Sequence, residues 1–244
     1  PLLYDHGFIE GNGAQFTWFV PHNLPALFEL MGGADTAAAR LNRQFELTRV
    51  FRFCNEHPEE EPVTGQKYVN NCRTWINYSN QPSSQAAFIF NYAGQSWLTQ
   101  KWSRAVVDSV FSGLSPYSGY QGDEDQGLMG SLAVLMKIGL FQMNGGCEED
   151  PAYEIGSPIF DEVTIHLNPV YYKAKTVSIK MLGNGPKSPY IQAATLNGKP
   201  LSTWYIRHSN IKAGANIKLK MGKEPCKECW KPLLGKPKKA ASTW

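Results

Sequence analysis

The spacing of apolar residues changes once along this chain of 244 residues, and this change constrains the fold more than any other feature. Before Gly145 and Gly146 the apolar residues recur at helical spacing, whereas several later segments alternate apolar and polar residues as half-buried strands do. The pattern predicts an α+β chain with a helical part over residues 1–150, a β part over residues 151–222 and a basic tail over residues 223–244.

The helical part contains three clear periodic segments. Residues 25–47 are interrupted by Gly32 and Gly33, so two short helices are predicted there in place of one. Residues 94–111 and 126–141 each predict one helix. In the first of these, Lys101 and Arg104 are expected on the exposed face.

The β part is predicted from residues 163–167, 177–181 and 217–221, which alternate between apolar and polar side chains. Residues 190–196 lead into Asn197 and Gly198, a pair that favours a tight hairpin turn. Antiparallel strands are therefore expected. Residues 223–244 are rich in lysine and are expected to have no structure of their own.

Composition excludes several classes of function. The net charge of +3 is too small to imply a nucleic-acid partner, and no run of about 18 apolar residues is present to span a membrane. The chain begins with Pro1 and shows no signal-peptide pattern, as expected of a piece cut from something longer or already processed. Asn77 lies in a glycosylation sequon, which would be used only in a secreted protein.

The chain has five cysteines, and this odd number leaves at least one thiol free or paired with another chain. Cys226 and Cys229 have the spacing of a zinc or redox site. A single such pair in a segment rich in proline and lysine is a weak indication of either function.

Glu10 is the first candidate for chemistry. It precedes a glycine-flanked turn and a run of aromatic residues. A carboxyl in such surroundings is expected to be desolvated, which favours the protonated form that a general acid needs. A surface or helix-capping glutamate is the alternative.

Asp123 and Asp125 form the second candidate. They are two residues apart in an acidic loop, so in an extended loop they point to the same side. Adjacent acids repel one another unless a cation or a proton relieves them. A solvated turn before the helix is the alternative.

Residues 80–85 form a third polar cluster, in which amide and hydroxyl side chains precede an aromatic segment. Amides both donate and accept hydrogen bonds, which suits sugar hydroxyls, although a plain helix-start loop would look the same. Glycoside hydrolysis needs two carboxyls from separate parts of the chain. Glu10 with Asp123 or Asp125 is therefore a chemically sensible pair.

Six segments in the same order resemble glycoside hydrolase family 92 α-mannosidases. They include EGNGAQFTWFVPHN at residues 10–23, NYAGQSWLTQKW at residues 91–102 and GDEDQGLM at residues 122–129. The other three lie in the β part, at residues 153–161, 190–201 and 206–211. The resemblance covers about residues 7–222.

The resemblance implies part of an (α/α)₆ barrel followed by strands of a β-sandwich domain, and inverting release of terminal α-mannose from glycans. Glu10 falls on the general acid, and Asp125 with Asp123 falls on the general base. Gln15, Trp18 and His22 lie in the first signature and are expected to bind the substrate. Calcium is expected to bridge the enzyme and the mannose hydroxyls, with ligands at Asn80 and Gln81, and the protein is expected to be secreted.

The chain departs from the family pattern at two points. The calcium loop of the family usually reads Gly-Asn-Glu-Pro, whereas Gln81 stands here in place of the charged residue, so calcium is expected to bind more weakly or not at all. The N-terminal sandwich and first barrel helices have no counterpart here. The chain is therefore expected to be a fragment completed by a missing N-terminal half, as a separate chain, or to pack differently alone.

These departures keep a second function open. A truncated scaffold with a weakened calcium site and a basic tail also fits a non-catalytic mannan-binding or glycan-binding protein of defence or cytotoxic type.

Overall fold

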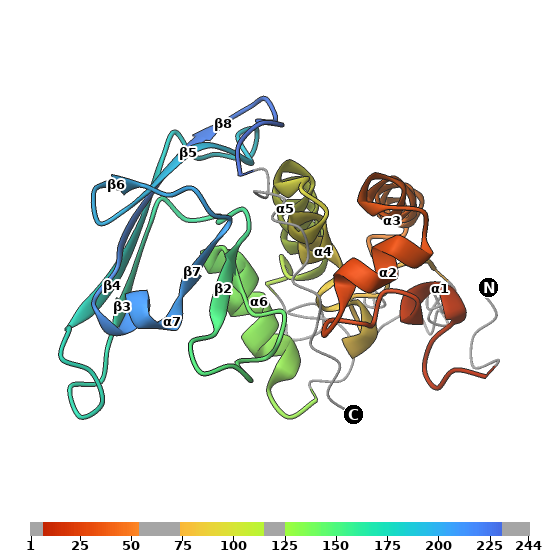
Figure 1. The fold of residues 1–244 in the computed structure, drawn as a ribbon, viewed down its shortest axis with the longest axis horizontal. Helices are drawn as coiled ribbons and strands as arrows, with labels where there is room; N and C mark the ends of the chain where they lie inside the picture. The colour runs from red at the N-terminus through yellow and green to blue at the C-terminus, as the bar shows by residue number, and fades with distance from the viewer. Residues whose placement is uncertain (1–6, 54–73, 115–124, 231–244) are drawn as a thin grey trace.

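The computed structural model describes residues 7–53, 74–114 and 125–230. Figure 1 shows helices α1 to α5 on one side and the large sheet, with the short helix α7, on the other. Helix α6 (Leu128–Ile138) and strand β2 (Ala152–Ile155) lie between them. The expected mixture of helices and strands is confirmed. Two hydrophobic cores lie beneath this arrangement. The helical core includes Trp18, Phe45, Phe88, Trp102 and Phe141. The sheet core includes Val177, Ile191, Ile217, Leu219 and Trp230.

The predicted helices are confirmed. Residues 25–47 form α2, Leu24–Leu30, and α3, Ala34–Arg49. Gly32 and Gly33 separate these helices at φ values of 91° and 107°, in the left-handed region that favours glycine. The other helices are α1 (Gly13–Phe16), η2 (Gln81–Ser83), η3 (Ala86–Phe88), α4 (Ile89–Tyr92), α5 (Ser96–Val110), α6 (Leu128–Ile138) and α7 (His208–Lys212).

Helix α5 lies between the two cores. Its Trp102 is fully buried and stacks on Phe45 with ring centroids 5.0 Å apart. On its other side, Gln100 Oε1 accepts a hydrogen bond of 2.9 Å from the Ile191 backbone N–H in the sheet. The helix is therefore held from both sides, which the sequence period alone did not indicate.

The expectation that Arg104 faces solvent is wrong, because only 6% of it is exposed. Its guanidinium donates to the carbonyl oxygens of Ser157, Pro158 and Gly185, and to Oδ1 of Asn184 at 3.0 Å. Burial lowers the pKa of Arg104. Arginine is tolerated there because its fixed fork of donors matches several oxygens at once. Tertiary packing thus overrides the helical period at this position.

The large sheet has the strand order β3-β4-β8-β5-β6. The expected antiparallel pairing is confirmed for β3 with β4, β5 with β6 and β5 with β8, whereas β4 and β8 pair in parallel. The chain between them forms β5, β6, β7 and α7, and a connection of this length allows β8 to return in the same direction as β4. The predicted hairpin at Asn197 and Gly198 is confirmed, with Leu196 opposite Lys199. The strands of this sheet are β3 (Glu162–His166), β4 (Thr176–Leu182), β5 (Tyr190–Leu196), β6 (Lys199–Pro200) and β8 (Asn216–Gly222).

A smaller sheet has the order β1-β2-β7, and both of its strand pairs are antiparallel. Its strands are β1 (Leu140–Phe141), β2 (Ala152–Ile155) and β7 (Tyr205–Arg207). Helix α6 leads directly into β1 through Gly139, where φ is 82° and an added Cβ would lie 2.8 Å from Pro158. The small sheet therefore joins the last helix of the helical part to the β part.

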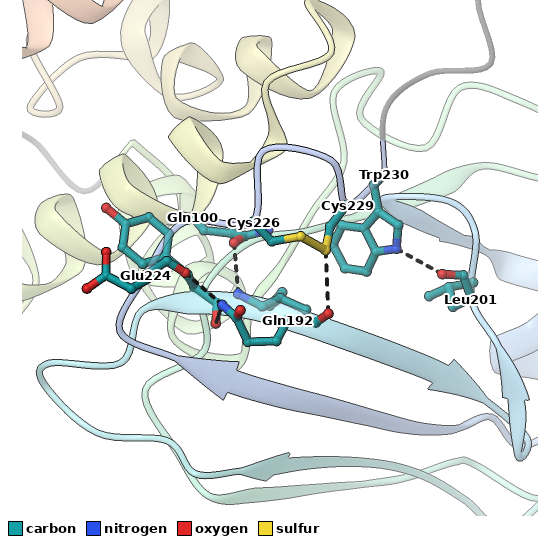
Figure 2. The surroundings of a disulfide bond; sticks show 9 residues. Gln100, Gln192, Leu201, Glu224, Cys226, Cys229 and Trp230 are labelled. Carbon is teal, nitrogen blue, oxygen red and sulfur yellow. Dashed lines mark hydrogen bonds between the residues drawn. A yellow bond between two sulfur atoms is a disulfide. The ribbon is translucent and has the colours of Figure 1, made fainter.

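Residues 223–230 are folded against the sheet, so the expectation of a tail without structure is wrong for this part of it. Cys226 and Cys229 form a disulfide, and Trp230 is buried, with its indole N–H donating to Leu201 O at 2.9 Å. Figure 2 shows these groups beside Gln192, whose Nε2 donates to Glu224 O at 2.8 Å. The apolar area buried by one tryptophan explains why a segment rich in lysine is fixed here.

Candidate functional site

Glu10 lies just before helix α1, at the point where the chain turns. Its φ is 54°, and its backbone oxygen accepts a hydrogen bond of 2.7 Å from Asn80 Nδ2. Asn12, two residues later, caps α1 by accepting from the backbone N–H groups of Ala14 and Gln15. Glu10 is exposed, in contrast to the desolvated setting expected from its aromatic neighbours in sequence.

The loop of Asn80 and Gln81 connects Glu10 to the acidic loop before α6. Asn80 Oδ1 accepts from the Gln81 N–H at 2.9 Å. The side chain of Gln81 donates from Nε2 to Asp125 Oδ2 at 2.5 Å. Two neighbouring amide side chains therefore contact the Glu10 backbone on one side and the Asp125 carboxylate on the other. The sequence separations are 70 and 44 residues, so only the fold brings these groups together.

Asp125 is exposed and has a φ of 55°, and Gln126 and Gly127 also have positive φ values of 60° and 95°. Three successive residues in this conformation turn the chain sharply before α6 begins at Leu128. The Asp125 backbone oxygen accepts from the Leu128 N–H at 3.3 Å. Asp123 lies outside the described residues.

The expected substrate-binding residues occupy different environments. Gln15 is buried and donates from Nε2 to Thr74 O at 2.9 Å, beside Asn12, which donates to the same oxygen. Trp18 is 1% exposed, lies in the helical core and donates from Nε1 to Gln44. His22 is exposed in the turn before α2. The structure thus places Trp18 inside the scaffold and leaves His22 at the surface.

The residues expected to bind calcium do not form a complete ligand set by themselves. Within residues 7–53, 74–114 and 125–230, no group of three or more His, Cys, Asp or Glu side chains could hold a metal ion. Calcium takes about six to eight oxygen ligands. Here Asn80 Oδ1 and Asp125 Oδ2 already accept hydrogen bonds from Gln81. The described residues therefore do not fit a calcium ion without rearrangement or further ligands.

The family follows from a match that extends over almost all of these elements. The protein-family model described as the glycosyl hydrolase family 92 catalytic domain matches residues 3–223. The chain belongs to this family. A protein of Arthroderma benhamiae described as an uncharacterized secreted glycosidase is 31% identical over 221 residues. That alignment covers 91% of this chain and 24% of the fungal protein, so the chain spans about a quarter of the length of that relative.

Solved family 92 structures from Bacteroides thetaiotaomicron share the fold. An inverting mannosidase is 30% identical with a TM-score of 0.70, and the match covers 92% of this chain and 29% of that protein. An α-mannosidase in complex with mannoimidazole is 24% identical with a TM-score of 0.71, over 91% of this chain and 26% of that protein. No helix in the part of the chain that the structure describes is long and apolar enough to cross a membrane.

The disulfide of this family 92 chain removes the zinc interpretation of Cys226 and Cys229, because a metal-binding cysteine must be a thiolate. Cys147 is exposed and free, whereas Cys54 and Cys72 lie outside the described residues. Asn77 of the sequon is buried, and its Oδ1 accepts from the Ser79 N–H at 2.8 Å. A glycan on Asn77 is incompatible with this packing.

Sequence reasoning missed Glu154, which is 1% exposed in the middle of β2. Burial raises the pKa of Glu154 to about 8, opposed by hydrogen bonding from Tyr92. The Tyr92 hydroxyl donates to Glu154 Oε1 at 2.6 Å. The pKa of Tyr92 is raised mainly by burial and, to a smaller extent, by the neighbouring Glu154 charge. One signal was available, since a glutamate directly before Ile155 interrupts an otherwise apolar strand.

Proposed function

We propose that this chain is the C-terminal part of a secreted family 92 glycosidase that releases terminal α-mannose from glycans with inversion. The contact that carries the proposal is the pair of amides at Asn80 and Gln81, which links the Glu10 turn to the Asp125 carboxylate. The mannosidases among its structural relatives and the secreted description of the fungal protein support it.

In the proposed reaction, Glu10 donates a proton to the leaving oxygen of the glycosidic bond. Asp125, together with Asp123, takes a proton from the water that attacks the opposite face of the sugar. An inverting enzyme leaves room for this water, so its two carboxyls lie roughly 6.5–9.5 Å apart. The exposure of Glu10 and Asp125 leaves both carboxyls accessible to a sugar.

The substrate-binding assignment is part of the same proposal. Gln15 and His22 are proposed to contact the sugar. Trp18 is proposed to position this segment from within the helical core, where it is buried and bonded to Gln44. The remaining surface of the sugar site would come from parts of an (α/α)₆ barrel that this chain does not include.

Calcium is proposed to bind weakly at this site. Asn80 and Gln81 would supply neutral amide oxygens, and a bound calcium ion would orient mannose hydroxyls. For Gln81 to turn its oxygen toward a cation, its hydrogen bond to Asp125 must break. This competition, added to the missing negative charge, supports low affinity.

The experiment measures mannose release from a synthetic α-mannoside by the chain and by a longer protein that contains it. Glu10→Gln is expected to lower kcat by at least about 100-fold in whichever form is active, because it removes the proton donor. Glu29→Gln, at an exposed glutamate in α2, is the matched control and should act as the parent. Full activity of Glu10→Gln would refute the assignment. Mannan binding without release by either form would favour a non-catalytic protein.

A further inference from the structure

A cavity lies away from Glu10 and shares no residue with the candidate site. It has a volume of about 270 Å³ and is formed where the end of α4 meets the small sheet. Figure 1 shows β2 and β7 of that sheet between the helices and the large sheet. Its walls include Tyr92, Glu148, Glu154, Trp204, Tyr205 and Arg207.

The cavity wall contains a buried carboxyl whose hydrogen bonding is incomplete. Glu154 lies on the central strand between Phe141 and Tyr205, and Oε1 accepts from the Tyr92 hydroxyl. Oε2 is buried, and within the described residues it has no hydrogen bond of normal geometry, although the Asn91 amide and the Met143 N–H face the carboxyl. This carboxyl lies behind the cavity surface, where it holds the Tyr92 hydroxyl in place at the wall.

Aromatic rings form the apolar side of the cavity. The rings of Tyr92 and Trp204 have centroids 4.8 Å apart, and those of Trp204 and Tyr205 are 4.9 Å apart. The Arg207 guanidinium lies over the Tyr205 ring, 5.0 Å from its centroid, and covers that face of the ring. Trp204 and Tyr92 therefore form the apolar wall. Such a wall binds the C–H face of a ring, while nearby polar groups fix its orientation.

The charges around the cavity are balanced. Arg207 and Glu148 form an ion pair of 3.2 Å at the rim. Burial raises the pKa of Glu154 to about 8, so this carboxyl is mostly neutral at pH 7 and can both donate and accept. A ligand with a strong charge of either sign would therefore find no counter-charge. A neutral ring with several hydroxyls matches the polar groups, the aromatic wall and the volume.

We propose that this cavity binds one neutral pyranose residue of a glycan, which packs on Trp204 and exchanges hydrogen bonds with the Tyr92 hydroxyl, oriented by Glu154. The site is distinct from the one that contains Glu10. The proposal holds whether or not the chain hydrolyses mannosides, because it needs no chemistry at Glu10.

The test titrates the chain with methyl α-mannopyranoside, methyl β-glucopyranoside and methyl β-galactopyranoside, up to about 10 mM. The indole N–H resonance of Trp204 in ¹⁵N NMR is the signal, assigned by comparison with Trp204→Phe. At least one pyranoside should shift this resonance saturably. Trp204→Ala should weaken binding at least about tenfold, whereas Trp97→Ala in α5 should leave it unchanged, with shifts then followed at Tyr205.

Glu154 provides a second pair of variants. Glu154→Gln keeps a donor and an acceptor of nearly the same size and should retain binding at pH 7, whereas Glu154→Leu should weaken it about tenfold. Thermal unfolding of each variant shows that it is folded under the titration conditions.

Four outcomes would overturn the proposal. In the first, no pyranoside shifts the Trp204 resonance, and in the second, Trp204→Ala binds as tightly as the parent. In the third, tetramethylammonium binds more tightly than every pyranoside, which would indicate a cation site. In the fourth, Glu10→Gln abolishes binding, which would place the sugar at the other site. Loss of hydrolysis in Glu10→Gln with unchanged pyranoside binding would keep the two sites separate.

Discussion

Gln81 donates from Nε2 to Oδ2 of Asp125 at 2.5 Å, so a neutral amide contacts the carboxylate that the family pattern assigns to base catalysis. An amide can donate to a carboxylate, whereas a glutamate at the same position could only repel it. The glutamine therefore satisfies Asp125 without a cation. This contact explains how the two loops can stay together when no metal is bound.

Gln81→Glu should strengthen calcium binding at the proposed site. The new carboxylate would face Asp125, and the repulsion between them is relieved when a divalent cation binds, so calcium affinity is expected to rise at least about tenfold. Isothermal titration with calcium measures this change. The double variant Gln81→Glu with Asp125→Asn is the control and should lose most of the gain. Equal calcium affinity in Gln81→Glu and the parent would contradict this role for Gln81.

Glu154 should make the free energy of unfolding fall as pH rises from about 4.5 to about 8. Its pKa is raised by burial to about 8, above the ordinary glutamate value of 4.5, so between these values the folded state holds a proton that the unfolded state has released. Stability is therefore greatest below pH 4.5 for this group and decreases toward pH 8, by up to about 1.4 kcal/mol per pH unit. Urea unfolding from pH 5 to pH 8 measures the slope.

Glu154→Gln is the comparison for that slope, because glutamine does not titrate. The free energy of unfolding of Glu154→Gln minus that of the parent should increase from pH 5 to pH 8. Tyr92, Glu148 and Arg207 line the same cavity as Glu154 and remain in both proteins, so their own contributions cancel in the difference. A constant difference across this range would show that Glu154 is ionised in the folded state throughout.

The segment at residues 223–230 should be held more by Trp230 than by the disulfide. Replacing both Cys226 and Cys229 by serine opens a loop of only four residues, for which chain entropy predicts a loss of about 2 kcal/mol. Trp230→Ala should cost about 3–5 kcal/mol, because it empties a buried position and removes the bond to Leu201. Urea unfolding compares them with Cys147→Ser, which should change stability by less than about 0.5 kcal/mol.

Arg104→Met should destabilise the chain by about 3 kcal/mol or more. Methionine fills similar space but leaves the buried carbonyl oxygens of Ser157 and Pro158 without their donor. Lys101→Met, one turn earlier on the same helix, is the matched control. Its half-exposed ion pair with Glu46 should contribute less than about 1 kcal/mol. Similar stabilities for the two variants would refute a clamping role for Arg104.

The helices and hairpin of this chain could be predicted because their causes are local. Gly32 and Gly33 separate α2 from α3, and Asn197 with Gly198 forms the turn between β5 and β6. Arg104 and Glu154 could not be placed in this way. Each lies on an element whose period the sequence shows, but its burial depends on partners far along the chain, such as Pro158 and Tyr92.

For the candidate site, the sequence determined the family and the residue types, because the motifs around Glu10 and Asp125 are contiguous segments whose order can be read directly. Only the tertiary structure decided which groups meet. Asn80 contacts Glu10, which is 70 residues away, and Gln81 contacts Asp125, which is 44 residues away. Trp18 is directed into the core. The physical reason is that side-chain contacts of this kind depend on how packed elements orient the backbone, and no local period encodes that orientation.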